Sequence, residues 1–232
     1  MDDILIIPDV HGRTFWKEDL KHDLIIFLGD YLDPYPNEGI TNEQALENFK
    51  EILRFKEENK DKVILLLGNH DLQYVSHIIT TDRVDKKNYK EISRLFTTNN
   101  NFFKVVHYLK YKDKNVVFSH APITDGWVKC VNYLHPTLPE GDFVALLDKL
   151  NELWRNFMYG SPVLFGALSF CSYYRGGADA YGSPIWADVR EAQETADWYQ
   201  IFGHTQLKDA YISATFADLD CRKCFKINHV LK

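Results

Sequence analysis

The sequence predicts an α/β protein built on a mainly parallel sheet, and two observations lead to this class. Short apolar runs typical of buried strands alternate with helical patterns over about the first seventy residues. Each run is also followed within two residues by Asp or Asn, at the strand end where α/β proteins place their sites. The 232 residues, 45% of them hydrophobic and 26% charged, fit a single domain spanning residues 1–232.

The first part of the chain predicts three strands, at residues 4–7, 24–28 and 63–67, separated by two helices. The first helix is short, at about residues 15–20. The second begins after Thr41, which reads as its N-cap, and runs to about Lys60. Its apolar side chains recur at helical spacing: Ala45, Leu46, Phe49, Ile52, Leu53 and Phe55.

The rest of the chain predicts the same alternation. Residues 71–112 are expected to be helical and then extended, and residues 115–118 form a strand that leads to a histidine. A helical pattern covers 142–158, and a segment rich in Gly, Ser, Tyr and Pro at 160–190 is expected to be a long ordered loop over a site. Further strands are expected at these places: residues 198–202, about 210–217 and about 224–231.

Composition limits the function. The net charge of −6 argues against general nucleic-acid binding and against binding to a membrane surface, since both need a basic face. No apolar run approaches the ~20 residues of a membrane span, and the acidic start does not match a secretory signal, so a cytoplasmic protein is expected. Cys221 and Cys224 have the C-x-x-C spacing of a zinc or redox pair, but they lack two further ligands and are expected to be free thiols.

Polar side chains that can bind metals follow five of the predicted strands. In chain order they are Asp9 and His11, Asp30 and Asp33, Asn69 and His70, His120, and His204. The carboxyl ends of parallel strands meet at one edge of a sheet, so these side chains are expected to converge. One carboxylate can bridge two metal ions ~3.5–4 Å apart, and we assign that role to Asp30. Taken singly, an Asp in a loop more often caps a helix, and a lone histidine is more often a satisfied polar group.

The order of these motifs resembles the calcineurin-like metallophosphoesterases, and within them the serine/threonine protein phosphatases and their bacterial relatives. The matching motifs span residues 9–205: Asp9-x-His11, Gly29-Asp30-x-x-Asp33, Gly68-Asn69-His70-Asp71, Ser119-His120-Ala121 and Gly203-His204. The resemblance implies a four-layer α/β/β/α sandwich of two mixed sheets with helices outside.

The resemblance also implies a centre of two divalent metal ions. Position by position, it assigns Asp9, His11 and Asp30 to the first ion, and Asp30, Asn69, His120 and His204 to the second. This mixture of nitrogen and oxygen ligands suits Mn, Fe, Zn or Co. His70 would be the general acid and Asp33 would orient it.

The implied function is hydrolysis of a phosphorylated substrate. A hydroxide shared by the metal ions would attack phosphorus while His70 protonates the leaving group. The substrate is expected to be a phosphate monoester or a phosphoprotein. The alternatives are a nucleotide phosphohydrolase acting on dinucleoside polyphosphates or cyclic nucleotides, and a catalytically dead binding scaffold. The oligomeric state and any protein partner cannot be read from the sequence.

Two departures from the family pattern concern the phosphate. Protein phosphatases carry an arginine directly after the second aspartate to grip it, and Pro34 stands there in this chain. They also carry Gly-Gly where this chain has Ala121-Pro122. Because guanidinium groups bind phosphate in a bidentate way, other arginines become candidates for the grip: Arg175 first, then Arg13 and Arg190.

Overall fold

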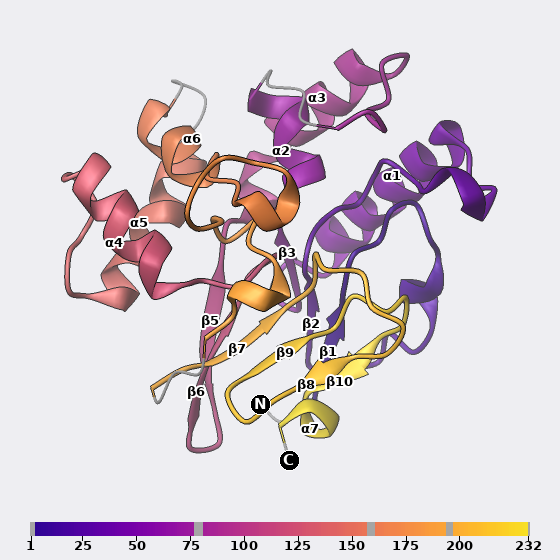
Figure 1. Cartoon of the computed structure of the whole chain (residues 1–232). Coiled ribbons are helices and arrows are strands. Elements are labelled where there is room, and N and C mark those ends of the chain that lie inside the picture. Colours follow the sequence, from indigo (N-terminus) through magenta and orange to yellow (C-terminus); the bar gives the residue numbers. More distant parts are fainter. Residues whose placement is uncertain (1–2, 77–80, 157–160, 194–196, 232) are drawn as a thin grey trace. The chain divides into compact units, whose positions relative to one another are not determined.

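A computed structural model describes residues 3–76, 81–156, 161–193 and 197–231. The chain divides into two compact units, and each is described by itself below. Unit 1 comprises Met1–Phe103 and Cys221–Lys232, and unit 2 comprises Lys104–Asp220. Each unit contains one mixed five-stranded sheet and its own helices, which confirms the predicted α/β class with two mixed sheets (Figure 1).

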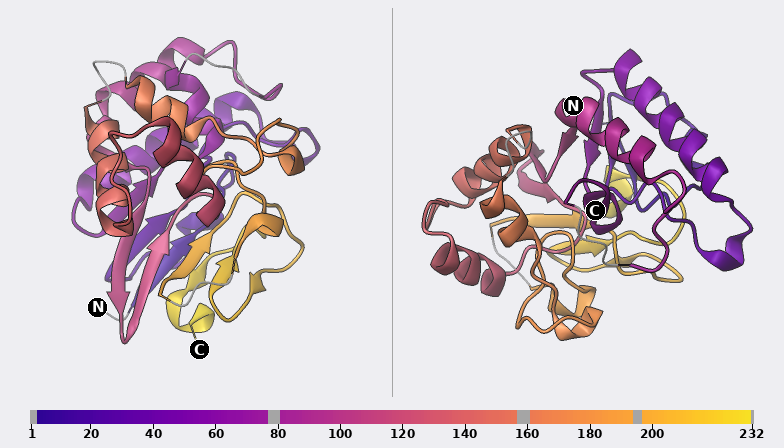
Figure 2. Two further views of the ribbon diagram at one scale, coloured as in Figure 1. Left: turned by 60° about the vertical axis from the view of Figure 1, so that its left-hand side comes forward. Right: turned by 90° about the horizontal axis from the view of Figure 1, so that it is seen from above.

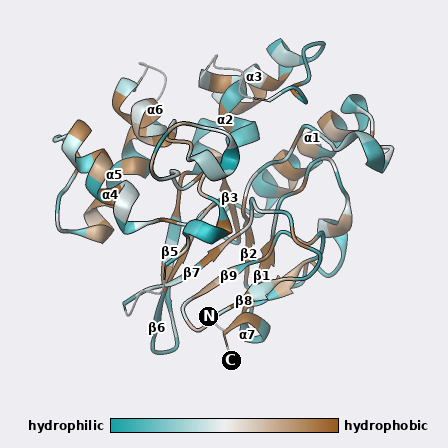
Figure 3. Cartoon of the chain, in the orientation of Figure 1, coloured by the Kyte–Doolittle hydropathy of each residue, from teal (hydrophilic) through white to brown (hydrophobic). Residues whose placement is uncertain are grey.

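The sheet of unit 1 has the strand order β10-β1-β2-β3-β4. The strands are β1 (Ile4–Ile7), β2 (Leu24–Phe27), β3 (Val63–Leu66), β4 (Phe103–Lys104) and β10 (Phe225–Lys226). The first three are parallel, with Ile6 opposite Ile26 and Ile26 opposite Ile64, whereas β10 pairs antiparallel with β1. Nearly every residue of β1, β2 and β3 is buried, as expected of parallel strands covered on both faces, and these strands are coloured as hydrophobic in Figure 3.

The helices of unit 1 are α1 (Asn42–Glu58), α2 (Asn69–Ser76), α3 (Tyr89–Thr98) and α7 (Ile227–Val230), together with the 3-10 turns η1 (Phe15–Lys17), η2 (Pro36–Glu38) and η3 (Asn100–Phe102). Thr41 is the N-cap of α1 as predicted, because its side chain accepts from Gln44 N and the Gln44 side chain accepts from Thr41 N. The buried stripe of α1 includes Phe49, which stacks on Tyr31 at 5.3 Å between ring centroids.

The sheet of unit 2 has the strand order β5-β6-β7-β9-β8. The strands are β5 (His107–Tyr111), β6 (Lys114–Phe118), β7 (Tyr199–Phe202), β8 (Tyr211–Ile212) and β9 (Phe216–Asp218). The three central strands β6, β7 and β9 are parallel, and the two edge strands pair antiparallel with their neighbours. Parallel pairing places the carboxyl ends of β6 and β7 at the same edge of the sheet.

Three helices of unit 2 lie together, α4 (Asp125–Leu134), α5 (Phe143–Arg155) and α6 (Pro162–Leu168), as both views in Figure 2 show. Thr124, Asp142 and Ser161 cap them by accepting from a backbone N–H of the first turn. Trp127 on α4 donates its indole N–H to Ala167 O on α6 at 2.9 Å. The 3-10 turns η5 (Tyr173–Arg175) and η6 (Val189–Glu191) lie in the segment that follows α6.

Several predicted elements were wrong in kind or extent. The helix expected at 15–20 is only the turn η1, and the strand expected at 210–217 is the hairpin of β8 and β9. The strand expected at 224–231 stops after β10 and continues as α7, with Ile227 and Val230 on its buried side. The segment at 160–190 contains α6, while the last residues of the predicted helix 142–158 lie outside the described part of the chain.

Among the described residues, no helix has both the length and the apolar character needed to cross a membrane.

Candidate metal and catalytic site

Asp9 and His11 follow β1, and the His11 ring lies between a carbonyl and two carboxylates. His11 Nδ1 is 2.8 Å from Leu32 O, while its Nε2 is 3.5 Å from an oxygen of Asp30 and 4.0 Å from one of Asp9. Burial lowers the pKa of His11 well below its usual range, so the ring is neutral near pH 7. Because a carbonyl oxygen only accepts, Nδ1 carries the hydrogen and Nε2 presents its lone pair to the carboxylates.

This set of donor atoms fits a divalent metal ion. A nitrogen lone pair and two carboxylates that face one another repel, whereas a cation among them binds all three. Histidines that bind metals also commonly donate the other ring N–H to a carbonyl, as His11 does to Leu32. Ligand atoms of His11, Asp30 and His70 lie within 4.8 Å of one another. Unit 1 therefore contains His and Asp groups able to hold a metal ion.

The Asp30 carboxylate lies against the loop that follows β3. Its Oδ1 accepts from His70 N at 2.9 Å. A Cβ added to Gly68 would collide with this carboxylate, and a Cβ added to Gly29 would lie 2.5 Å from Gly68 N. The glycines of the Gly29-Asp30 and Gly68-Asn69 motifs are thus what lets the two strand-end loops approach each other.

Asp71 joins the same two loops, a role that the sequence analysis did not assign. Its Oδ2 accepts from Asp30 N at 2.7 Å and from Gly68 N at 2.9 Å, and its Oδ1 accepts from Tyr31 N at 3.0 Å. Burial, with the nearby charge of Asp30, raises the pKa of Asp71 well above its usual range. The available signal was a carboxylate in the first turn of a predicted helix, three residues after a glycine.

His70 and Asp33 form the pair that the family pattern expects. His70 Nδ1 lies 2.7 Å from Asp33 Oδ2, and both side chains are buried. Asp33 also accepts from Gln73 Nε2 and from the Tyr74 hydroxyl, which in turn accepts from Asp85 N at 2.8 Å. Burial, reinforced by the Asp33 charge, raises the pKa of Tyr74, so its hydroxyl stays a donor. Asp33 is therefore fixed by three donors and can hold the His70 ring in one orientation.

The backbone at the strand ends is unusual. Among the described residues that are not glycine, few have positive φ, and four of these are proposed site residues: His11 (45°), Asp30 (52°), Asp33 (59°) and His204 (69°). Such conformations cost of order 1–3 kcal/mol each and cluster at functional sites. Asp and His adopt them more readily than most residues, which suits these positions to ligand-type side chains.

Two proposed ligands of unit 2 lie side by side at the ends of neighbouring parallel strands. His120 follows β6 and His204 follows β7, and Gly203 N donates to His120 O at 2.9 Å. His120 Nε2 lies 3.1 Å from His204 Nδ1. Two nitrogens that bind one ion at ~2.0–2.1 Å lie ~3 Å apart, so the spacing of these two nitrogens is compatible with both binding the same ion.

Asn69, the last proposed ligand, is the first residue of α2 and is buried in unit 1.

The three arginines proposed to grip phosphate all have carboxylate partners. Arg13 forms a bidentate pair with Glu38, at 2.7 Å from Nε and 2.8 Å from Nη2. In unit 2, Arg190 Nε lies 2.6 Å from Asp188, and Arg175 Nη1 lies 3.6 Å from the same carboxylate. These pairs do not exclude the proposed role, but each guanidinium already faces a carboxylate: Asp188 is shared by Arg175 and Arg190, and Glu38 also pairs with Arg222.

A fourth arginine, Arg83, was missed and lies directly at His70. Its Nη2 is 2.8 Å from His70 Nε2, and its Nη1 donates to Asp33 O at 2.6 Å. Arg83 lies in the segment between α2 and α3, outside every motif and beside no glycine. The sequence therefore held no local signal for its position.

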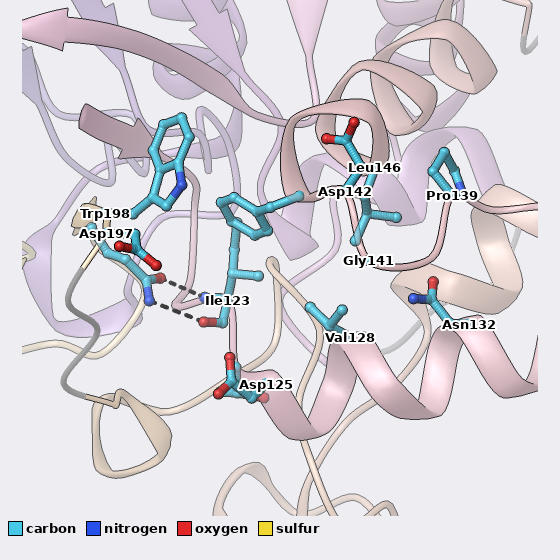
Figure 4. A pocket seen from close by; sticks show the side chains of 13 residues that line it. Ile123, Asp125, Val128, Asn132, Pro139, Gly141, Asp142, Leu146, Asp197 and Trp198 are labelled. Carbon is cyan, nitrogen blue, oxygen red and sulfur yellow. Dashed lines mark hydrogen bonds between the residues drawn. The ribbon is translucent and has the colours of Figure 1, made fainter.

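A cavity of about 310 Å³ in unit 2 contains none of the proposed site residues (Figure 4). It is lined by α4, by the start of α5 with the segment before it, and by the start of β7 with the residues before it, including Val128, Phe143 and Trp198. The Gln200 side chain spans its wall by bonding the main chain of Ile123 in both directions, at 2.9 and 3.0 Å. The candidate chemistry is therefore at the strand ends and not in this cavity.

Comparison with known proteins agrees with the motif order. The family model described as calcineurin-like phosphoesterase matches residues 3–208. No match was found among curated proteins. Among solved structures, the phosphatase domain of the Legionella effector WipB matches with 16% identity and a TM-score of 0.45, over 81% of this chain and 73% of that domain.

Proposed function

Because the chain belongs to the calcineurin-like phosphoesterase family and is a metal-dependent phosphoesterase, we propose that it hydrolyses phosphate monoesters with two metal ions and with His70 as general acid. The observation that carries this proposal is the His70–Asp33 pair. It lies beside the carboxylates and imidazole of Asp30 and His11, at the carboxyl ends of β2 and β3. A proton donor next to a metal-binding group is the arrangement that ester hydrolysis needs.

The proposed ligands are those expected from the sequence. Asp9, His11 and Asp30 would hold one ion. For the second, the order of the family motifs along the chain supports Asp30, Asn69, His120 and His204. The donor set of imidazoles, carboxylates and an amide suits Mn, Fe, Zn or Co. When bound, such ions supply an activated water and neutralise charge on the phosphoryl oxygens.

The residues of this chain would control the leaving group. Asp33 accepts the Nδ1 hydrogen of His70, which fixes the orientation of the ring. In the structure His70 Nε2 can only accept from Arg83 Nη2, because a guanidinium has no acceptor. As the general acid, His70 would carry a proton on Nε2 once Arg83 donates to the substrate instead, and would deliver that proton to the departing oxygen. Gln73 and Tyr74 keep the Asp33 carboxylate in place through its other hydrogen bonds. No covalent intermediate with the protein is required.

The test compares leaving groups in the variant His70→Ala, with the exposed His229→Ala as the matched control. We expect kcat for phenyl phosphate to fall ~10²–10⁴-fold, the range of general acid catalysis. The fall should be much smaller for dinitrophenyl phosphate, whose leaving group departs without a proton. Elemental analysis should find the metal content unchanged. An equal fall for both esters would contradict the acid role.

A further inference from the structure

We propose that Arg83 binds the phosphate of the substrate and replaces the arginine that Pro34 displaces from its usual place in the family. The proposal rests on the proposed function and deepens it, because it names the group that selects phosphate monoesters.

The contacts of Arg83 hold its guanidinium beside His70, the proposed general acid. Nη1 donates to Asp33 O at 2.6 Å, and Nη2 lies 2.8 Å from His70 Nε2. The guanidinium carbon also lies over the Tyr35 ring, 3.9 Å from its centroid. A planar cation stacked on an aromatic ring loses little freedom when it binds a ligand. His70 Nε2 is the atom that would meet the leaving oxygen, so a group in contact with it is within reach of the phosphate. Arg83 donates to Nε2 in the structure, and this hydrogen bond opens when Nε2 carries the proton for the leaving group, which leaves the guanidinium to donate to the phosphate.

Arg83 has a positive charge that an anionic substrate could neutralise. Its partners among the described residues of unit 1 are a carbonyl, a ring nitrogen and an aromatic face, none of which carries a negative charge. Among the described residues, no carboxylate forms an ion pair with it. Arg13, Arg175 and Arg190 differ in this respect, because each is paired with Glu38 or Asp188. A phosphate bound by one of those three would compete with a carboxylate that already faces the guanidinium.

The ester class follows from the number of free oxygens. A phosphate monoester has three non-bridging oxygens, so some can face cations at the strand ends while others accept from a guanidinium fork. A diester has only two, and its single charge is bound less strongly. Arg83 should therefore contribute more to monoester hydrolysis than to diester hydrolysis.

The experiment uses Arg83→Ala and Arg83→Lys, with Arg94→Ala on α3 as an exposed arginine control. Calorimetry of the metal-loaded proteins with inorganic phosphate should show Kd raised ~10–100-fold in Arg83→Ala, the effect of losing charge-assisted hydrogen bonds. Arg83→Lys should recover only part of this affinity, since an ammonium cannot bind two oxygens in one plane. Metal content should not change. KM for phenyl phosphate should rise by a similar factor, and the loss for bis(nitrophenyl) phosphate should be smaller.

Esters with different leaving groups distinguish a role of Arg83 in binding phosphate from a role in positioning His70. If Arg83 binds phosphate, Arg83→Ala loses the same factor for phenyl and dinitrophenyl phosphate. If it only positions His70, the loss is confined to the phenyl ester, and the proposal is overturned. It is also overturned if Arg83→Lys keeps the wild-type Kd for phosphate, or if Arg13→Ala, Arg175→Ala or Arg190→Ala abolishes phosphate binding while Arg83→Ala does not. A wild-type protein that holds both ions but hydrolyses no ester would refute the proposed function itself, and this inference with it.

Discussion

Replacing Asp71 should loosen the two strand-end loops, and the hydrogen bonds of its carboxylate give the size of the effect. Asp71 is fully buried, and its two oxygens accept three backbone N–H groups, from Asp30, Tyr31 and Gly68. Leaving a buried N–H without an acceptor costs ~1–3 kcal/mol. Asp71→Ala leaves all three N–H groups without a hydrogen-bond acceptor. We therefore expect it to lower the free energy of unfolding by ~3 kcal/mol or more.

Asp71→Asn should be milder for a structural reason. The amide oxygen can take the place of Oδ2 and keep the bonds from Asp30 N and Gly68 N, while the amide nitrogen faces Tyr31 N–H. Only the Tyr31 N–H then lacks an acceptor, which lowers the free energy of unfolding by ~1–3 kcal/mol. Removing the Asp71 charge also relieves its repulsion with Asp30, the same repulsion that helps to raise the pKa of Asp71. The expected order of stability is therefore wild type, Asn, then Ala.

The assay is urea unfolding of protein stripped of metal, followed by tryptophan fluorescence and circular dichroism. Stripping matters because an ion bound at Asp30 would add its own stabilisation to the folded state. The exposed Asp61→Ala serves as the control. For a chain of this length, ~3 kcal/mol corresponds to a fall in Tm of roughly 6–12 °C. An Ala variant with the midpoint of the control would refute the reasoning, and equal loss in Asn and Ala would show that charge, not acceptor number, holds the loops.

Two further predictions address metal binding and pH. Gly68→Ala should weaken metal binding ~10–100-fold, as loss of a supporting contact does, because its Cβ would displace the Asp30 carboxylate; competition with a chelating dye measures this, and a folded variant with wild-type affinity would contradict it. His107→Phe should remove a loss of stability at acidic pH, because burial, aided by Lys104, lowers the pKa of His107 from 6.5 to about 4. A neutral histidine whose pKa is lowered by folding makes its full contribution to stability above pH 6.5 and loses it as the pH falls toward 4. Between pH 7.5 and 4.5, the free energy of unfolding of the wild type should therefore fall by about 2.5 kcal/mol more than that of the variant, as measured by urea unfolding. Equal falls in the two proteins would refute the assignment.

The parts of the fold that the sequence predicted well are those set by local pattern. The strands at 4–7, 24–28 and 63–67 are continuous apolar runs that end at Gly or Pro, and α1 has both a capping box and a long apolar stripe. The missed helix α6 also had a start signal, because Ser161 followed by Pro162 is a favourable N-cap and first residue. The strand β10 could not be delimited, since two residues of pairing with β1 leave no period to detect.

The site divides in the same way. His70 and Asp33 could be paired before the structure because the motif order implied it, and Asp9, His11, Asp30, Asn69, His120 and His204 stand at strand ends that alternation predicts. Asp71 and Arg83 act through contacts with residues about forty to fifty positions away in the chain, to the loops of Asp30 and Asp33. Such contacts depend on how β2 and α2 pack, which cannot be predicted from the composition or from the spacing of motifs along the sequence.

Ion pairing distinguishes Arg83 from the three arginines proposed from the sequence. Glycines beside Arg175 made close approach to a phosphate plausible, but glycines say nothing about whether a guanidinium already has a counter-ion. In the structure the carboxylates of Glu38 and Asp188 occupy the arginines that the sequence favoured. An arginine that folding places against a carbonyl, an imidazole and an aromatic ring keeps its charge for a ligand. Arg83 was proposed because no carboxylate among the described residues pairs with it, and that property depends on tertiary contacts that the local sequence does not record.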